Sequence, residues 1–288
     1  MLHIVGKWTT RTKPIVAHRQ EAVRLIVNNR RAALPTGAAT PIKGNMLKWL
    51  RRITGLVAGG ISILFLIYIL GPRPASFTPD GSLPEATASL ADLEAGIDNA
   101  ESRVPGLKPD NEARIVWANP DLREKTAVSM VYLHGFGARQ AEGRPVHTAL
   151  ARRFGCNLYL ARLAEHGIDR PDAFSQLTAE RYLASAKEAV AIGRALGEEV
   201  VLVATSTGAS LALYIAAENP DVAAVVAYSP FVDLPGSMLF LPRGPWGYQL
   251  TSLLLGNPVI KEREEPVRRY WSRVYSPEAY VSLSSLLG

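Results

Sequence analysis

Residues 199–220 read EVVLVATSTGASLALYIAAENP, and this stretch decides the fold that we expect. The apolar run Val200–Ala204 predicts a buried strand, and a helix is expected from Gly208 until Pro220 ends it. Ser206 lies in the tight turn between strand and helix, and we call residues 204–208 the elbow. Such a turn presents a serine hydroxyl as a nucleophile, because small flanking residues let the strand and the helix approach closely. The alternative is an ordinary strand-to-helix turn of an α/β domain.

A second turn precedes the elbow in the chain. The nearly continuous apolar run Ala127–Leu133 predicts a strand covered on both faces, and it leads into the sequence HGFGA, residues 134–138. We call these five residues the glycine turn. A glycine-rich turn at the end of a strand lets a backbone N–H group point into a crevice, where it can stabilise an oxyanion.

The remaining patterns alternate between strands and helices. Strands are predicted over Glu112–Asn119, Cys156–Ala161 and Val222–Tyr228, and helices over Pro145–Phe154, Thr178–Leu196 and Ser276–Leu287. This order indicates an α/β fold with a doubly wound, mostly parallel sheet, whose ligands bind at the carboxyl ends of the strands. The highly charged segment Val259–Tyr275 is expected to form a solvated helix face.

The two turns together, 72 residues apart from His134 to Ser206, resemble the α/β-hydrolase superfamily. The resemblance extends over about residues 110–288 and is greatest to lysophospholipase-like and serine-aminopeptidase-like carboxylester hydrolases. It implies that Ser206 attacks a carboxylic ester of a lipid or a small acyl group and forms an acyl-enzyme. It also implies an oxyanion hole made by the backbone N–H groups of Phe136 and Thr207, with Gly135 and Gly137 beside the substrate.

The segment after the last predicted strand matches the place where family members insert a lid. Trp246 and Tyr248 within residues 234–258 would suit an apolar substrate, although a helix packed on the sheet is the alternative. Asp233 could orient a catalytic histidine, or it could simply cap a loop.

The histidines leave the expected machinery incomplete. A serine needs a base to take its proton, and in this superfamily the histidine follows the serine and the acid along the chain. None of the five histidines follows Ser206, and His134, His147 and His166 are expected to be structural. We therefore expect a sequence truncated at its C-terminus, whose hydrolase domain lacks its last strands. A complete chain would be a weak hydrolase using His134 or His166 as its base, or an inactive one serving as a binding or scaffold protein. A peptidase or an acyltransferase of the same fold is a further alternative.

The N-terminal part predicts attachment to a membrane. We expect a basic leader over residues 1–52, a transmembrane anchor over 53–70, a linker with a short helix (Leu90–Ser102) over 71–109, and the hydrolase domain over 110–288. Met46 is an alternative translation start. The cationic residues before the anchor favour a cytoplasmic N-terminus, which places the domain on the periplasmic or extracellular side. A cleaved signal peptide and a core helix are the alternatives.

The charge of the chain is unevenly distributed. The formal net charge of +6 arises because residues 1–52 carry 11 Lys or Arg and one acidic residue, whereas the remainder carries 21 basic and 25 acidic residues. This balance argues against a nucleic-acid surface on the domain. Cys156 is the only cysteine, and it is expected to be a small core residue. The sequence implies no metal and no organic cofactor.

Overall fold

The computed structural model describes residues 42–85, 89–232 and 240–287. The chain forms two compact units, residues 1–60 and 61–288, which are described separately. Helix α1 (Ile42–Ile69) contains the segment Asn45–Ile69, which is long and apolar enough to cross a membrane, with a mean hydropathy of 1.9. A signal sequence would have the same properties. Within the described residues none of its most apolar stretch is buried, which does not favour the core-helix alternative.

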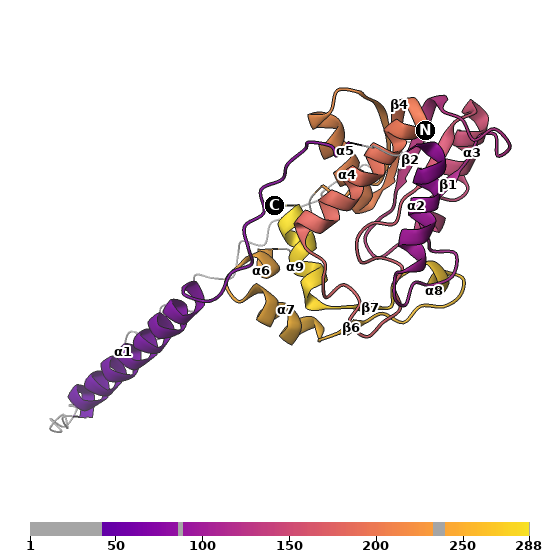
Figure 1. The fold of residues 1–288 in the computed structure, drawn as a ribbon. Helices are drawn as coiled ribbons and strands as arrows, with labels where there is room; N and C mark the ends of the chain where they lie inside the picture. Colours follow the sequence, from indigo (N-terminus) through magenta and orange to yellow (C-terminus); the bar gives the residue numbers. More distant parts are fainter. Residues whose placement is uncertain (1–41, 86–88, 233–239, 288) are drawn as a thin grey trace, which may run out of the picture. The chain divides into compact units, whose positions relative to one another are not determined.

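A five-stranded sheet forms the centre of the second unit (Figure 1). Its strands are β1 (Arg114–Val116), β2 (Thr126–Leu133), β3 (Asn157–Leu160), β4 (Gly197–Thr205) and β5 (Val222–Tyr228), in the order β1-β3-β2-β4-β5. β2 is parallel to β3 and β4, and β4 is parallel to β5, whereas β1 is antiparallel to β3. The predicted mostly parallel sheet is therefore confirmed.

The first strand is shorter than the sequence pattern predicts. Only Arg114–Val116 of the expected strand Glu112–Asn119 pair with β3. The N–H group of Ala118 donates instead to the side-chain oxygen Oδ1 of Asn157, at 2.9 Å. This side-chain contact replaces the next backbone bond and ends the ladder.

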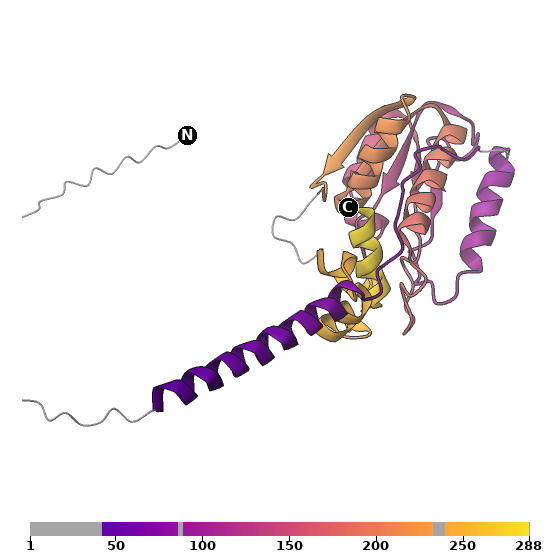
Figure 2. The same cartoon turned by 90° about the vertical axis from the view of Figure 1, so that its left-hand side faces the viewer.

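Helices cover both faces of the sheet, as the doubly wound prediction requires (Figure 2). Helices α4 (Ala179–Leu196) and α5 (Ser206–Glu218) bury one face, and α3 (Val146–Phe154) packs on the other. The side chains of β2 alternate between two hydrophobic clusters: Val131 and Leu133 join the cluster under α4 and α5, and Met130 and Tyr132 join the cluster that contains Ala151 of α3. This two-residue period is what a strand covered on both faces produces.

Helix α2 (Leu90–Ser102) has the predicted boundaries. The Ser89 hydroxyl oxygen accepts a hydrogen bond from the Asp92 N–H at 3.2 Å, which satisfies a free donor in the first turn. Ile97 and Glu101 face inward, and Glu101 Oε2 forms an ion pair with Arg162 Nε at 2.6 Å. This pair fastens the helix to the loop after β3.

The segment after β5 differs from the prediction. It contains α6 (Phe240–Arg243), α7 (Gly247–Leu255), β6 (Val259–Ile260), α8 (Val267–Tyr270), β7 (Val274–Tyr275) and α9 (Pro277–Leu286). The expected helix face over Val259–Tyr275 is wrong: its ends pair as two antiparallel strands, and only α8 between them is helical. The physical reason is burial, since Val274 and Tyr275 belong to the main core. The predicted last helix, Ser276–Leu287, is confirmed as α9.

Candidate active site

Ser206 lies at the junction of β4 and α5, where the strand passes into the helix without a loop. Its backbone has φ = +52°, in the left-handed region that residues with a side chain rarely occupy. Local strain of this kind holds the serine of a nucleophile elbow at the surface of the sheet. The side chain is half-buried, and α5 begins at Ser206, two residues earlier than predicted.

Gly208 permits the close approach on which the elbow depends. β2 and β4 run parallel with Leu133 opposite Ala204, so the glycine turn and the elbow leave the sheet side by side. A Cβ atom on Gly208 would lie 2.3 Å from the carbonyl oxygen of Leu133 and 2.5 Å from that of His134. Any larger residue would push the start of α5 away from β2.

The glycine turn faces the serine across this contact. The position of a Cβ atom on Gly135 lies 3.1 Å from Ser206 Cβ. The turn is closed by a hydrogen bond from the Ala138 N–H to the Gly135 carbonyl at 3.1 Å. Gly137 has φ = +74°, and a Cβ there would lie 2.1 Å from the hydroxyl oxygen of Tyr275. Glycine is thus required at Gly137 by both conformation and space.

The two expected oxyanion donors lie on these two turns. The Phe136 ring packs against the rings of His166, Phe174 and Tyr275, with ring centroids 5.7–5.8 Å apart. Thr207 is buried in the first turn of α5, where the helix offers its N–H no acceptor. Their assignment as an oxyanion hole stays a prediction.

A half-buried carboxylate that sequence reasoning missed connects the two turns. Glu142, in the short 3₁₀ helix η1 (Gln140–Gly143), accepts a hydrogen bond from the Gly135 N–H at 2.7 Å and one from the Tyr132 hydroxyl at 3.4 Å. The Tyr132 hydroxyl also lies 3.0 Å from Thr205 Oγ1, at the end of β4. Burial raises the pKa of Glu142, and its hydrogen bonds with Gly135 and Tyr132 partly oppose that rise.

The three described histidines are buried, and each bonds away from the serine. His134 contacts the Gly135 carbonyl and Arg139, His147 contacts the Gln140 carbonyl at 2.7 Å, and His166 contacts the Ala164 carbonyl at 2.7 Å. Burial holds the pKa of all three rings below the ordinary value. Within the described residues none of them is hydrogen-bonded to Ser206, so packing roles are the simplest account of them.

The structure places the expected lid residues with other neighbours. The backbone N–H of Trp246 donates to the Pro72 carbonyl at 2.7 Å, and the indole ring of Trp246 lies against Gly71. Tyr248 receives a hydrogen bond from Asn257 at 3.2 Å and lines a cavity that Ser206 does not line. A substrate-binding role for Trp246 and Tyr248 stays a prediction, and Asp233 lies outside the described residues.

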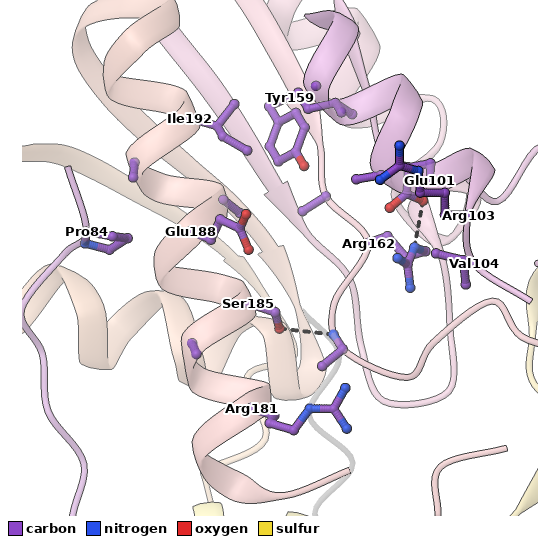
Figure 3. A pocket seen from close by; sticks show the side chains of 18 of the residues that line it. Pro84, Glu101, Arg103, Val104, Tyr159, Arg162, Arg181, Ser185, Glu188 and Ile192 are labelled. Carbon is purple, nitrogen blue, oxygen red and sulfur yellow. Dashed lines mark hydrogen bonds and ion pairs between the residues drawn. The ribbon is translucent and has the colours of Figure 1, made fainter. Parts of the chain in front are cut away.

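A separate cavity of about 910 Å³ lies between α2 and α4 (Figure 3). Tyr159, Ile192 and Val104 supply apolar surface, and the Glu101–Arg162 ion pair crosses one side. Neither the elbow nor the glycine turn contributes to its lining. Within the described ranges, no group of three or more His, Cys, Asp or Glu side chains could hold a metal ion.

Comparisons with known proteins agree with this architecture. The family model described as the alpha/beta hydrolase family matches residues 130–285. A thermostable monoacylglycerol lipase from Bacillus sp. (strain H-257) is 29% identical over 148 residues, which cover 50% of this chain and 58% of the lipase. The chain thus spans little more than half the length of this relative.

Solved structures of hydrolases are also similar to the chain. One belongs to a study of the metagenome-derived lipolytic enzymes LipS and LipT, with 17% identity, a TM-score of 0.47, and coverage of 62% of this chain and 69% of that one. Another is the monoacylglycerol lipase of Paleococcus ferrophilus, with 15% identity, a TM-score of 0.40, and coverage of 60% and 68%. The family model matches more than half of the chain, from β2 to α9, and the chain belongs to the alpha/beta hydrolase family.

Proposed function

We propose that this protein is a membrane-anchored serine hydrolase that cleaves carboxylic esters through an acyl-enzyme on Ser206. The monoacylglycerol lipase similarity favours lipid-like or small acyl esters as substrates. Phe136 and Thr207 would donate their backbone N–H groups to the oxyanion of the tetrahedral intermediate. Gly135 and Gly137 would keep the substrate side of the glycine turn free of side chains.

One observation carries the proposal: Ser206 is held at φ = +52° on the junction of β4 and α5, with its Cβ beside Gly135. A half-buried serine held in this conformation, next to a turn rich in backbone donors, is arranged to attack a carbonyl group. Acyl transfer needs a nucleophile and an oxyanion site within one substrate's reach. The register of β2 and β4 supports that proximity.

Labelling of the detergent-solubilised full chain by a fluorophosphonate, followed by peptide mass spectrometry, tests the nucleophile. We expect the label on Ser206 and none on Ser206→Ala. Ser102→Ala, on the exposed side of α2, is the matched control and should label like the wild type. Hydrolysis of p-nitrophenyl esters from acetate to laurate then reports the preferred acyl length.

The outcomes separate the alternatives. Activity on esters that disappears in Ser206→Ala supports the proposal. Labelling of Ser206 with turnover only of aminoacyl substrates would favour a peptidase, and acyl transfer to an added alcohol would favour an acyltransferase. A wild-type chain that neither labels nor hydrolyses any ester would refute the proposal.

A second candidate is a binding or scaffold protein built on the hydrolase fold. The observation that favours it is the burial of His134, His147 and His166, whose described hydrogen bonds all go to groups other than Ser206. Such a protein would bind an ester or lipid without labelling. Equilibrium binding of a non-hydrolysable ether analogue to Ser206→Ala and to the wild type would then give the same affinity.

The membrane assignment is part of the same proposal. The hydropathy of Asn45–Ile69 supports an anchor, and Lys48, Arg51 and Arg52, which precede its uncharged part over residues 53–69, support a periplasmic or extracellular domain. If residues 53–70 are an anchor, the chain divides into a leader before it, a linker over 71–109 and a domain from residue 110. Protease protection in sealed vesicles would report the side on which the domain lies.

A further inference from the structure

A buried arginine lies in the loop that follows the glycine turn. Arg139 is 1% exposed, and its Nη1 atom donates to His134 Nε2 at 3.0 Å. Its Nε and Nη2 atoms have no hydrogen-bond partner within the described residues, where it also forms no ion pair. Gly167 makes room for the guanidinium, since a Cβ there would lie 2.4 Å from Arg139 Nε.

A purely structural role explains this arginine poorly. Burying a charge without a paired anion is costly, and an apolar side chain of similar volume would give equal or greater stability. The carboxylate of Glu101 is already engaged by Arg162 Nε at 2.6 Å and by the Ala113 N–H at 3.0 Å (Figure 3). Among the described residues Arg139 therefore has no paired anion, and His134 is the group to which it donates a hydrogen bond.

The hydrogen bonds fix the protons of His134. The Gly135 carbonyl oxygen, 2.9 Å from His134 Nδ1, can only accept, so Nδ1 carries the proton. Arg139 and the Leu163 N–H, which is 3.1 Å away, can only donate, so Nε2 is the acceptor. Burial and the charge of Arg139 hold the pKa of His134 well below its ordinary value, in agreement with a neutral ring.

The chain of bonds ends on one particular peptide group. The Gly135 carbonyl accepts from His134 Nδ1 and from the Ala138 N–H, and the same peptide carries the Phe136 N–H. Hydrogen bonds in series polarise one another, and they do so more strongly in a water-free interior. A carbonyl that accepts two donors draws charge through its conjugated peptide and makes the attached N–H a stronger donor.

We propose that Arg139 and His134 are positioning residues that polarise the Gly135–Phe136 peptide and so strengthen the Phe136 N–H as a donor to the oxyanion. This inference rests on the proposed function, which assigns that N–H to the oxyanion hole. Removing an oxyanion donor outright lowers turnover about 10²–10³-fold. Each bond of a chain strengthens its neighbour by about 10–30%. Loss of the Arg139 charge should therefore slow reaction at Ser206 about 2- to 8-fold.

The test compares Arg139→Met, Arg139→Lys and His134→Asn in the full chain. Asparagine can still donate to the Gly135 carbonyl but cannot pass on the charge of Arg139. Arg153→Met, on the exposed side of α3, is the matched control. We expect slower fluorophosphonate labelling in Arg139→Met and His134→Asn, partial recovery in Arg139→Lys, and the wild-type rate in the control. The melting temperature of Arg139→Met should be unchanged or higher.

A second measurement does not depend on reaction at Ser206. The chain has seven phenylalanines, so selective ¹⁵N-phenylalanine labelling gives a sparse amide spectrum in which Phe136→Leu identifies the Phe136 signal. The ¹⁵N shift of Phe136 should move upfield in Arg139→Met and remain in place in Arg153→Met. An unchanged shift, or an unchanged labelling rate in a folded Arg139→Met, would overturn the inference. A loss of labelling that only follows a loss of melting temperature would overturn it as well.

The two proposals can fail separately. If the wild type does not label, the proposed function fails and the Phe136 shift alone decides the inference. If the wild type labels but the shift does not respond to Arg139, the function stands and the inference fails. If Arg139→Met does not fold, Arg139→Lys and His134→Asn supply the same comparison.

Discussion

Replacement of Gly208 by alanine should destabilise the domain, because the new methyl group would meet backbone rather than a movable side chain. Its Cβ would lie 2.3 Å from the Leu133 oxygen, 2.7 Å from the Leu133 carbonyl carbon and 2.5 Å from the His134 oxygen. Overpacking of this kind costs about 3 kcal/mol. Alanine also gains about 1 kcal/mol over glycine in a helix. The net loss is thus about 2 kcal/mol.

The assay is thermal unfolding of the solubilised full chain, followed by near-ultraviolet circular dichroism. A loss of about 2 kcal/mol should lower the melting temperature by about 4–8 °C in a domain of this size. Gly96→Ala is the matched control, since it lies within α2 and a Cβ there would meet nothing within 4 Å. The control should melt about 2–4 °C higher than the wild type. If Gly208→Ala were stabilised as much as Gly96→Ala, the close approach of α5 to β2 would be refuted.

Three further changes test other parts of the molecule. Burial raises the pKa of Glu142, so between the unfolded and the folded pKa values only the folded state holds the proton, and this group lowers stability as pH rises through that interval. The melting temperature of Glu142→Gln should therefore rise relative to that of the wild type from pH 4 to pH 7. A difference in melting temperature that does not change with pH would contradict this. Glu101→Ala leaves the charge of Arg162 buried and unpaired, and urea unfolding should show a loss of about 3–5 kcal/mol, whereas a loss below 1 kcal/mol would show that the ion pair does not fasten α2. Ile61→Arg places a charge within the apolar helix α1 at a cost of about 3 kcal/mol, and carbonate extraction should release more of this variant from membranes than of Ile61→Leu.

The strands of the fold could be predicted because their signals are local. The apolar runs at β2, β3 and β4 are nearly continuous, as a parallel strand between two helical layers requires, whereas β5 has a similar run but lies at the edge of the sheet and is largely exposed. Helix α2 could be predicted in the same way, and Ser89 caps its first turn. The pair β6 and β7 was not, because it joins residues from the two ends of a charged segment, and local periodicity does not report such a pairing.

The residues of the candidate site also fall into those that local sequence predicts and those that it does not. Ser206 and the glycine turn could be predicted because their spacing and small residues are imposed by turn geometry. Glu142 and Arg139 could not, because each looks like an ordinary surface charge in the sequence. Their importance lies in what the folded chain places around them, the Gly135 N–H for Glu142 and the His134 ring for Arg139.

The direct passage from α4 into β4 has a consequence for how the chain tolerates change. The helix ends at Leu196 and the strand begins at Gly197, where a Cβ would lie 2.3 Å from the Ser129 nitrogen, so no loop residue separates them. A residue gained or lost in α4 therefore cannot be taken up locally and is passed on to β4. Since strand side chains alternate with a period of two, a shift by one residue would turn every side chain of β4 to the opposite face. The length of residues 197–205 therefore fixes the position of Ser206 relative to the sheet. Insertions and deletions are expected to be tolerated in other segments.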